Sequence, residues 1–247
     1  MMKHITGKAA LLALSMVTAS AFASHWGYEG KESPEHWGEL DEAYKTCQKG
    51  MNQSPINIDS TLDAHLSPLQ THYIDGPVTL TNNGHTIQAS EPADTRDTIT
   101  LDKQTWTLQQ FHFHSPSENT VHGKKYAMEM HLVHKNAAGE LTVVAVMFDK
   151  GAANPELEKL WSVMPQLAEQ NVSIKGDLNL NTLLPEDKTY FRFSGSLTTP
   201  PCSEGVTWIV LKHPMTVSAE QLDKFTHTMH HDNNRPVQSL HGRVVVE

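Results

Sequence analysis

The chain has 247 residues, 38% of them hydrophobic, and a formal net charge of −9. This length allows a substantial hydrophobic core. The acidic balance and the lack of a basic patch interleaved with aromatic residues argue against a nucleic-acid partner.

The N-terminal segment has the features of a secretory signal peptide. It starts with basic residues, continues with an apolar run over residues 9–17 and ends at the small-x-small sequence Ala21-Phe-Ala23. A membrane anchor is the alternative, but the run is too short to span a bilayer. We expect residues 1–23 to be removed and residues 24–247 to form one mature domain. The expected location is the periplasm, with no membrane span.

Cys47 and Cys202 are the only cysteines in the chain. In an oxidising compartment a lone pair predicts a disulfide, and two buried free thiols are the alternative. Cys202 directly follows Thr198-Thr-Pro-Pro201, so a bridge would brace that segment.

The body of the chain is rich in expected strands. Turn residues such as Asn136-Ala-Ala-Gly139 separate several of them. Many strands with few helices predict one large sheet with helices at its margins. The expected strands cover residues 78–80, 98–101, 105–114, 126–134, 141–148, 189–193 and 206–211.

Two helices are expected. Asn154 can cap the first, with Pro155 at its first position, and Pro165 should kink or shorten it. Ser218 and Gln221 form a capping box for the second. The apolar stripe of the first helix comprises Leu157, Leu160, Trp161, Met164 and Leu167, and that of the second Leu222, Phe225 and Met229.

Three histidines are spaced so that they can share one face of a sheet. Side chains alternate between faces along a strand, so His112 and His114 point to one side and the phenylalanines beside them to the other. By the same parity His131 shares a face with Glu129. If the two strands are neighbours, three imidazoles converge. Three neutral imidazoles with an open fourth position are typical of a catalytic zinc site.

Eight short segments then carry a resemblance to a known family. They are His25-Trp-Gly-Tyr28, Pro34-Glu-His-Trp37, Gln53-Ser-Pro-Ile-Asn-Ile58, Asn82-Asn-Gly-His85, Gln110-Phe-His-Phe-His114, Glu129-Met-His-Leu-Val-His134, Ser196-Leu-Thr-Thr-Pro-Pro201 and Asn234-Arg-Pro236. Together they resemble the signature segments of the α-class carbonic anhydrases, in the family's order and over essentially the whole mature chain.

The resemblance implies a fold and an activity. The fold is mainly β, with a large, mostly antiparallel twisted sheet, a few peripheral helices and the metal in a conical cleft. The activity is the reversible hydration of CO₂ to bicarbonate and a proton, through attack by zinc-bound hydroxide. One Zn²⁺ per chain is expected, and the chain would be a monomer or a homodimer.

The resemblance also assigns residues to the metal. His112, His114 and His131 would hold Zn²⁺, which lowers the pKa of its bound water to about 7, a value established for carbonic anhydrases themselves. Because zinc-bound histidines need partners for their second nitrogens, Gln110, Glu129 and the backbone near Asn233 would support His112, His131 and His114, respectively.

Further residues would orient the nucleophile and bind the substrate. By resemblance, the Thr198 hydroxyl accepts from zinc-bound hydroxide and donates to Glu118, and Thr199 contacts bicarbonate. The apolar wall of the CO₂ pocket would comprise Val133, Val143, Leu197, Val206 and Trp208, each of which is also an ordinary core residue by type.

His85 matches the proton shuttle of the family. An imidazole with a pKa near 7, linked to the metal through waters, suits that task. The plainer interpretation is that Asn83-Gly84 is a hairpin turn and His85 its solvated flank. His134 lies on the opposite strand face from His131 and is expected to be structural. His227, His230 and His231 are expected to form a solvated cluster.

The chain departs from the family pattern at Ser115-Pro116, Asn119 and Asn234, which affects the expected cleft shape and inhibitor preference. Two other kinds of protein remain possible. His112-x-His114-x-x-x-Glu118 fits the first motif of a cupin oxidase with Glu118 as a ligand, although no second cupin motif follows. The 16 histidines also fit a non-catalytic zinc-binding protein.

Overall fold

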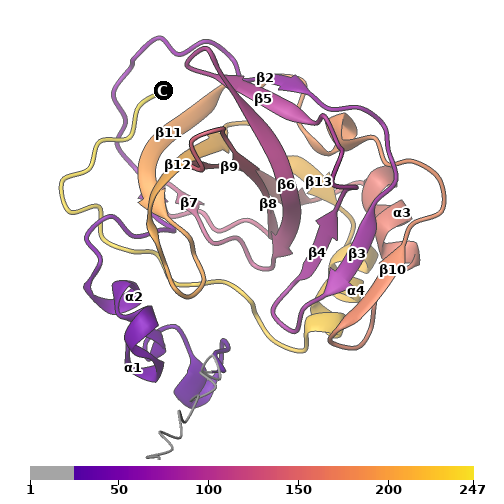
Figure 1. Cartoon of the computed structure of the whole chain (residues 1–247), viewed down its shortest axis with the longest axis horizontal. Helices are drawn as coiled ribbons and strands as arrows, with labels where there is room; N and C mark the ends of the chain where they lie inside the picture. The colour runs from indigo at the N-terminus through magenta and orange to yellow at the C-terminus, as the bar shows by residue number, and fades with distance from the viewer. Residues whose placement is uncertain (1–24) are drawn as a thin grey trace, which may run out of the picture.

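The computed structural model describes residues 25–247, so the expected signal peptide lies outside the described residues. An 11-stranded sheet, mostly antiparallel, forms the body of the molecule (Figure 1). The described residues therefore have the mainly β architecture that we expected. No helix among them is both long and apolar enough to cross a membrane.

The large sheet has the order β10-β3-β4-β6-β8-β9-β12-β11, with β2, β5 and β13 joined at its margins. Among the described strands of this sheet, β9 alone pairs in parallel, with β12 and β13. A separate parallel pair, β1 and β7, completes the strands. Their bounds are β1 Asn57–Ile58, β2 Gln70–His72, β3 Thr79–Asn82, β4 Ile87–Ser90, β5 Thr98–Leu101, β6 Gln104–His114, β7 Thr120–Val121, β8 Met128–Lys135, β9 Leu141–Lys150, β10 Gln170–Ser173, β11 Tyr190–Ser196, β12 Glu204–Leu211 and β13 Met215–Val217.

The helices are short and lie at the margins of the sheet (Figure 1). They are α1 Trp37–Leu40, α2 Thr46–Lys49, α3 Pro155–Ser162 and α4 Ala219–Met229, with 3₁₀ turns at Gly30–Glu32, Glu42–Tyr44 and Leu180–Leu183. The expected caps of the two longer helices are confirmed. Gln221 also links them, because its amide accepts from the backbone N–H of Asn154 and donates to its carbonyl.

Strand β6 separates two different environments. Phe111 and Phe113 are fully buried in the larger hydrophobic core, together with Trp161 of α3 and Phe225 of α4. His112 and His114, which alternate with the phenylalanines, point to the opposite face. Burial of each large aromatic side chain contributes about 2–3 kcal/mol. This packing therefore holds β6 in the one register that turns its histidines away from the core.

Cys47 and Cys202 are joined by a disulfide, as expected. The bridge belongs to a small cluster with the fully buried Trp37, and it ties the N-terminal segment that carries α1 and α2 to the segment after Pro201. It thereby connects two parts of the chain that are 155 residues apart in sequence.

All seven expected strands occur, and no bound shifts by more than three residues. Helix α3 ends at Ser162, three residues before Pro165, so Met164 and Leu167 of the expected stripe lie beyond it. Met164 is still buried, but Leu167 is 66% exposed, and the prediction is wrong there. We did not expect β1, β2, β4, β7, β10 or β13. These strands have two to four residues and exist through pairing with neighbours rather than through their own apolar pattern.

Candidate metal centre

The three histidines converge because β6 and β8 are antiparallel neighbours. His112 pairs with His131, and His114 with Glu129. One ring nitrogen from each histidine lies within 4.8 Å of the others, so the group could hold a metal ion. The parity of the two strands and their adjacency therefore produce the arrangement that the sequence predicted.

The second nitrogen of each histidine is held by a fixed oxygen. The Nδ1 of His112 lies 2.8 Å from the Gln110 Oε1, and the Nδ1 of His114 lies 2.7 Å from the carbonyl oxygen of Asn233. The Nε2 of His131 lies 2.9 Å from the Glu129 Oε1. Each contact selects one tautomer of its histidine. The nitrogens left free toward the common centre are the Nε2 of His112, the Nε2 of His114 and the Nδ1 of His131.

The free nitrogens fit a zinc ion. The Nε2 of His114 is buried and has no hydrogen-bond partner among residues 25–247, which is unfavourable unless a ligand occupies that position. Burial lowers the pKa of His112, His114 and His131, and His112 and His131 are lowered further by neighbouring histidines. All three are therefore neutral near pH 7. Three neutral imidazoles are the donor set of a catalytic zinc site.

Glu129 is fully buried, and four groups surround its carboxylate. Its Oε2 accepts from the backbone N–H groups of Glu118 and Asn119, at 2.7 and 2.8 Å. Its Oε1 accepts from the Asn119 side-chain amide at 2.7 Å and contacts His131. Burial raises the pKa of Glu129, while these hydrogen bonds oppose the shift. These hydrogen bonds fix the position of the carboxylate that contacts His131.

Asn119 is a positioning residue that sequence reasoning missed. Besides its two hydrogen bonds to Glu129, its Oδ1 accepts from the backbone N–H of Ile56 at 3.0 Å. One buried amide therefore connects the segment before β1 to the support of His131. We treated Asn119 only as a departure from the family pattern. The one sequence feature that could have pointed to this role is its place directly after Glu118.

Glu118 lies beside the histidines in a fully buried position. Its Oε1 accepts from the backbone N–H of Arg235 at 2.8 Å and lies 3.5 Å from the Nδ1 of His114. Burial raises the pKa of the carboxyl to about 8, although the Arg235 N–H and the Thr198 hydroxyl both act to lower it. Its Oε2 has no hydrogen bond of ordinary geometry. Thr198 is therefore near enough to affect Glu118, but the expected hydrogen bond between them stays a prediction.

Thr198 and Thr199 belong to a tightly held loop. The backbone N–H of Leu197 donates to the carbonyl of Ser203, and that of Cys202 to the carbonyl of Thr199. Cys202 continues into the disulfide, so both ends of the loop are attached to the body of the protein. The Thr198 side chain is nearly buried at 6% exposure.

Arg235 connects this region to the N-terminal part of the chain, and sequence reasoning assigned it no role of its own. Its guanidinium donates to the Gln53 Oε1 and to the carbonyls of Ser54 and Cys47, all at 2.8–2.9 Å. The side chain is 1% exposed, and burial lowers its pKa to about 10. Two of the signature segments, which are distant in sequence, therefore meet at one buried cation.

The five apolar residues of the expected substrate pocket lie in one hydrophobic cluster beside the histidines. Val143, Val206 and Trp208 are buried there, and Val133 and Leu197 pack against them. The Trp208 ring lies 4.9 Å from that of His131. A separate cavity of about 120 Å³ is lined by His112, His114 and Thr199 and also by His85.

His85 lies at that cavity, but its ring is stacked on Trp26, with ring centres 3.7 Å apart. Burial, and then the nearby His25 and His231, lower its pKa to about 4. The Asn83 side chain caps the turn by accepting from the N–H groups of His85 and Thr86. The hairpin interpretation is therefore correct for Asn83-Gly84, but the flank at His85 is only partly solvated.

A family model described as eukaryotic-type carbonic anhydrase matches residues 32–247. The chain belongs to the carbonic anhydrase family. A carbonic anhydrase of Klebsiella pneumoniae is 71% identical over 246 residues, which cover 100% of both chains. One of Pectobacterium carotovorum is 49% identical and covers 97% of this chain and 99% of its own. The solved complex of α-carbonic anhydrase from Thermovibrio ammonificans with the inhibitor sulfanilamide has a TM-score of 0.88 at 48% identity, and the match covers 92% of this chain and 100% of that one.

Membership in the carbonic anhydrase family identifies the chain as an enzyme and overturns the cupin interpretation. Glu118 is not part of the group that could hold a metal among the described residues, and it accepts from Arg235 instead. His134 contacts the Tyr73 hydroxyl at 2.9 Å in a buried position, which agrees with a structural role. His227 and His230 are exposed, whereas His231 is half-buried beside Tyr28.

Proposed function

We propose that this carbonic anhydrase catalyses the reversible hydration of CO₂ to bicarbonate and a proton, with one Zn²⁺ held by His112, His114 and His131. The observation that carries the proposal is the set of three free, neutral ring nitrogens, one of which is buried without a partner. When bound, Zn²⁺ lowers the pKa of a coordinated water to about 7, which is known for carbonic anhydrases, and so supplies a nucleophile at neutral pH.

Thr198 and Glu118 would select and orient that nucleophile. The Thr198 hydroxyl has one proton, which it would give to the buried Glu118 carboxyl when that group is ionised. Its oxygen is then left only to accept, so it favours a partner that carries a hydrogen. The backbone N–H of Arg235 keeps Glu118 in place for this contact.

CO₂ offers little to hydrogen-bond, so an apolar surface beside the metal suits it. We assign that surface to Val133, Val143, Leu197, Val206 and Trp208, in support of which all five share one cluster next to His131. Thr199, on the cavity wall with His112 and His114, would contact bicarbonate.

The test is removal and return of the metal. Dialysis against a strong zinc chelator is expected to abolish CO₂ hydration in a stopped-flow assay. Addition of Zn²⁺ should restore it fully at about one ion per chain, measured by elemental analysis. Full zinc content without hydration would instead support a non-catalytic zinc-binding protein, and hydration by metal-free enzyme would contradict the assignment of the site.

We also propose His85 as the proton shuttle. Its stacked ring is a poor base because burial lowers its pKa to about 4. A ring that turns away from Trp26 toward solvent loses this burial and regains ordinary basicity.

His85→Ala is expected to lower maximal CO₂ hydration in weak buffer by about tenfold or more, because the main proton acceptor is lost. Added imidazole should restore the rate. The matched control is His65→Ala, which removes a histidine that is 90% exposed and paired with Asp63. Unchanged turnover of the His85 variant in weak buffer would exclude His85 from this role.

We place the mature protein in the periplasm. The disulfide between Cys47 and Cys202 supports an oxidising location. The N-terminal sequence pattern supports export with cleavage before Ser24.

A further inference from the structure

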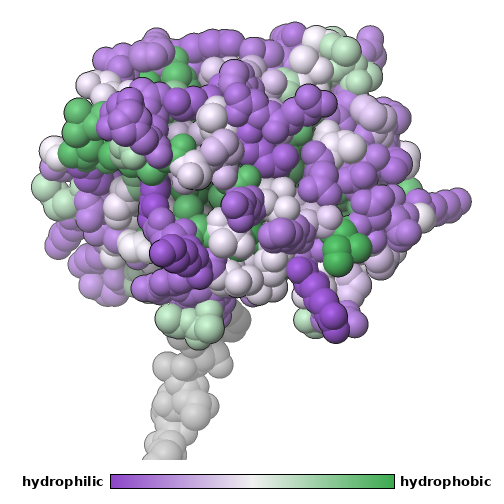
Figure 2. Space-filling model, turned by 90° about the horizontal axis from the view of Figure 1, so that it is seen from above, coloured by the Kyte–Doolittle hydropathy of each residue, from purple (hydrophilic) through white to green (hydrophobic). Residues whose placement is uncertain are grey.

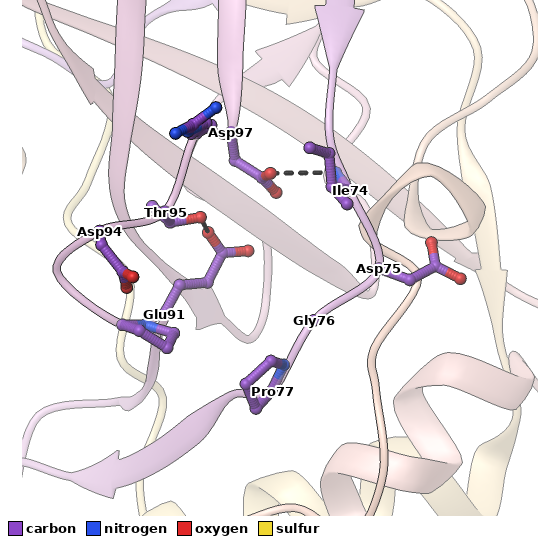
Figure 3. Close-up of a pocket in the computed structure, with 10 residues that line it drawn as sticks. Ile74, Asp75, Gly76, Pro77, Glu91, Asp94, Thr95 and Asp97 are labelled. Atoms are coloured by element: carbon purple, nitrogen blue, oxygen red, sulfur yellow. Dashed lines mark hydrogen bonds between the residues drawn. The ribbon is translucent and has the colours of Figure 1, made fainter.

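A second cavity shares no lining residue with the one beside the histidines. It lies where the chain between β2 and β3 meets the chain between β4 and β5, and its volume is about 240 Å³ (Figure 3). Four of its lining residues are acidic, and Arg96 is the single basic one. The acidic residues are Asp75, Glu91, Asp94 and Asp97.

Asp97 is a buried carboxylate with one unused oxygen. The residue is 1% exposed, and its Oδ1 accepts from the backbone N–H of Ile74 at 2.9 Å. Its Oδ2 is buried and accepts from no N–H or hydroxyl group, and no ion pair reaches Asp97 in the part of the chain that the structure describes. A buried anionic oxygen without a partner is strongly unfavourable, so a positive group at this position would stabilise it.

Glu91 faces Asp97 across the cavity. One of its oxygens, Oε2, accepts from the Thr95 hydroxyl at 2.7 Å, and the other points toward Asp97 (Figure 3). Burial raises the pKa of Glu91 to about 7, and the charge of Asp97 and a hydrogen bond to the Asp97 side chain add to the shift, although the Thr95 hydrogen bond opposes it. Below this pH a proton shared with Asp97 occupies the position, and above it both groups are free of one. Arg96 forms no ion pair with either carboxylate among the described residues. Two facing carboxyl groups therefore lack a counter-charge.

We propose that this cavity binds a hard divalent cation of the calcium type between Glu91 and Asp97. Only oxygen donors face the position, which suits Ca²⁺ rather than a soft metal. Ca²⁺ accepts six to eight oxygens in irregular geometry, and waters in the open cavity would complete the shell. Asp94 lies exposed at the rim of the same cavity and adds negative charge. Asp75 is exposed and its carboxylate points away from the cavity (Figure 3), so we leave it out of the ligand set.

The test uses zinc-loaded protein, dialysed free of Ca²⁺ and kept at pH 8 so that Glu91 is ionised. Titration with CaCl₂ is followed by calorimetry and by the midpoint of thermal unfolding. At about one hundred times Kd, we expect the midpoint to rise by roughly 5–10 °C. Absence of both binding heat and a midpoint shift at millimolar CaCl₂ would overturn the proposal.

Three variants show whether the ion binds here. Asp97→Asn keeps an acceptor for Ile74, and Glu91→Gln keeps one for Thr95, so each should fold without Ca²⁺. Each is expected to bind Ca²⁺ at least about tenfold more weakly. Asp223→Asn, an exposed position on α4, removes one charge elsewhere and should retain the full midpoint shift. An undiminished shift in both cavity variants, or an equal loss in Asp223→Asn, would refute binding at Glu91 and Asp97.

Discussion

Replacement of His131 by alanine is expected to lower CO₂ hydration by roughly a thousandfold or more, because the site loses one of three neutral ligands and can no longer activate water at pH 7. Among the three proposed ligands, His131 is the one that contacts Glu129, and Glu129 is itself held by Asn119 and by the backbone of Glu118. The loss should therefore appear in zinc content as well as in rate. Stopped-flow CO₂ hydration and elemental analysis of the same preparation measure both.

The control for His131→Ala is again the exposed His65→Ala, which should keep full zinc and full activity. Near-UV circular dichroism checks that the tertiary packing persists in both variants. A His131→Ala enzyme that folds, keeps one zinc per chain and hydrates CO₂ at the wild-type rate would remove His131 from the ligand set.

Thr198→Ala is expected to lower the rate of CO₂ hydration by about a hundred- to a thousandfold, which is typical when one preorganised hydrogen-bonding group is removed from an active site. Glu118→Gln should have a comparable effect because Glu118 acts through Thr198. If the two form one chain of hydrogen bonds, the double variant will be hardly slower than either single variant. Zinc content should be unchanged in all three, which separates orientation from metal binding.

Thr182→Ala provides a matched control, since its exposed hydroxyl donates to the carbonyl of Asn179 outside the site. It should have wild-type activity. Multiplicative losses in the Thr198/Glu118 double variant would mean that the two residues act independently and would contradict the proposed chain.

Figure 2 shows one face, on which hydrophilic residues predominate and hydrophobic ones form small separate patches. The exposed large hydrophobic residues are spread along the chain: Met51, Leu62, Ile74, Leu167, Val237 and Val244. Isolated exposed hydrophobic residues of this kind are normal on a globular protein.

Local patterns predicted the elements that depend on nearby residues. Alternation along β6 and β8 predicted which histidines share a face, and capping residues predicted the starts of α3 and α4. The error at Leu167 has a local cause too. An apolar residue at helical spacing was counted although Pro165 stops the helix before it.

The sequence by itself determined the parity of the histidines, the positions of the longer strands and the resemblance to one family. Only the tertiary structure decided which oxygen holds each histidine, that Asn119 and Arg235 fasten the support, and that Trp26 covers His85. The same holds for the meeting of Glu91 with Asp97. The physical reason is range: strand alternation acts over two residues, whereas these contacts join segments that the sheet brings together. Burial, which shifts the pKa values of His85 and Glu118, exists only once those segments are packed.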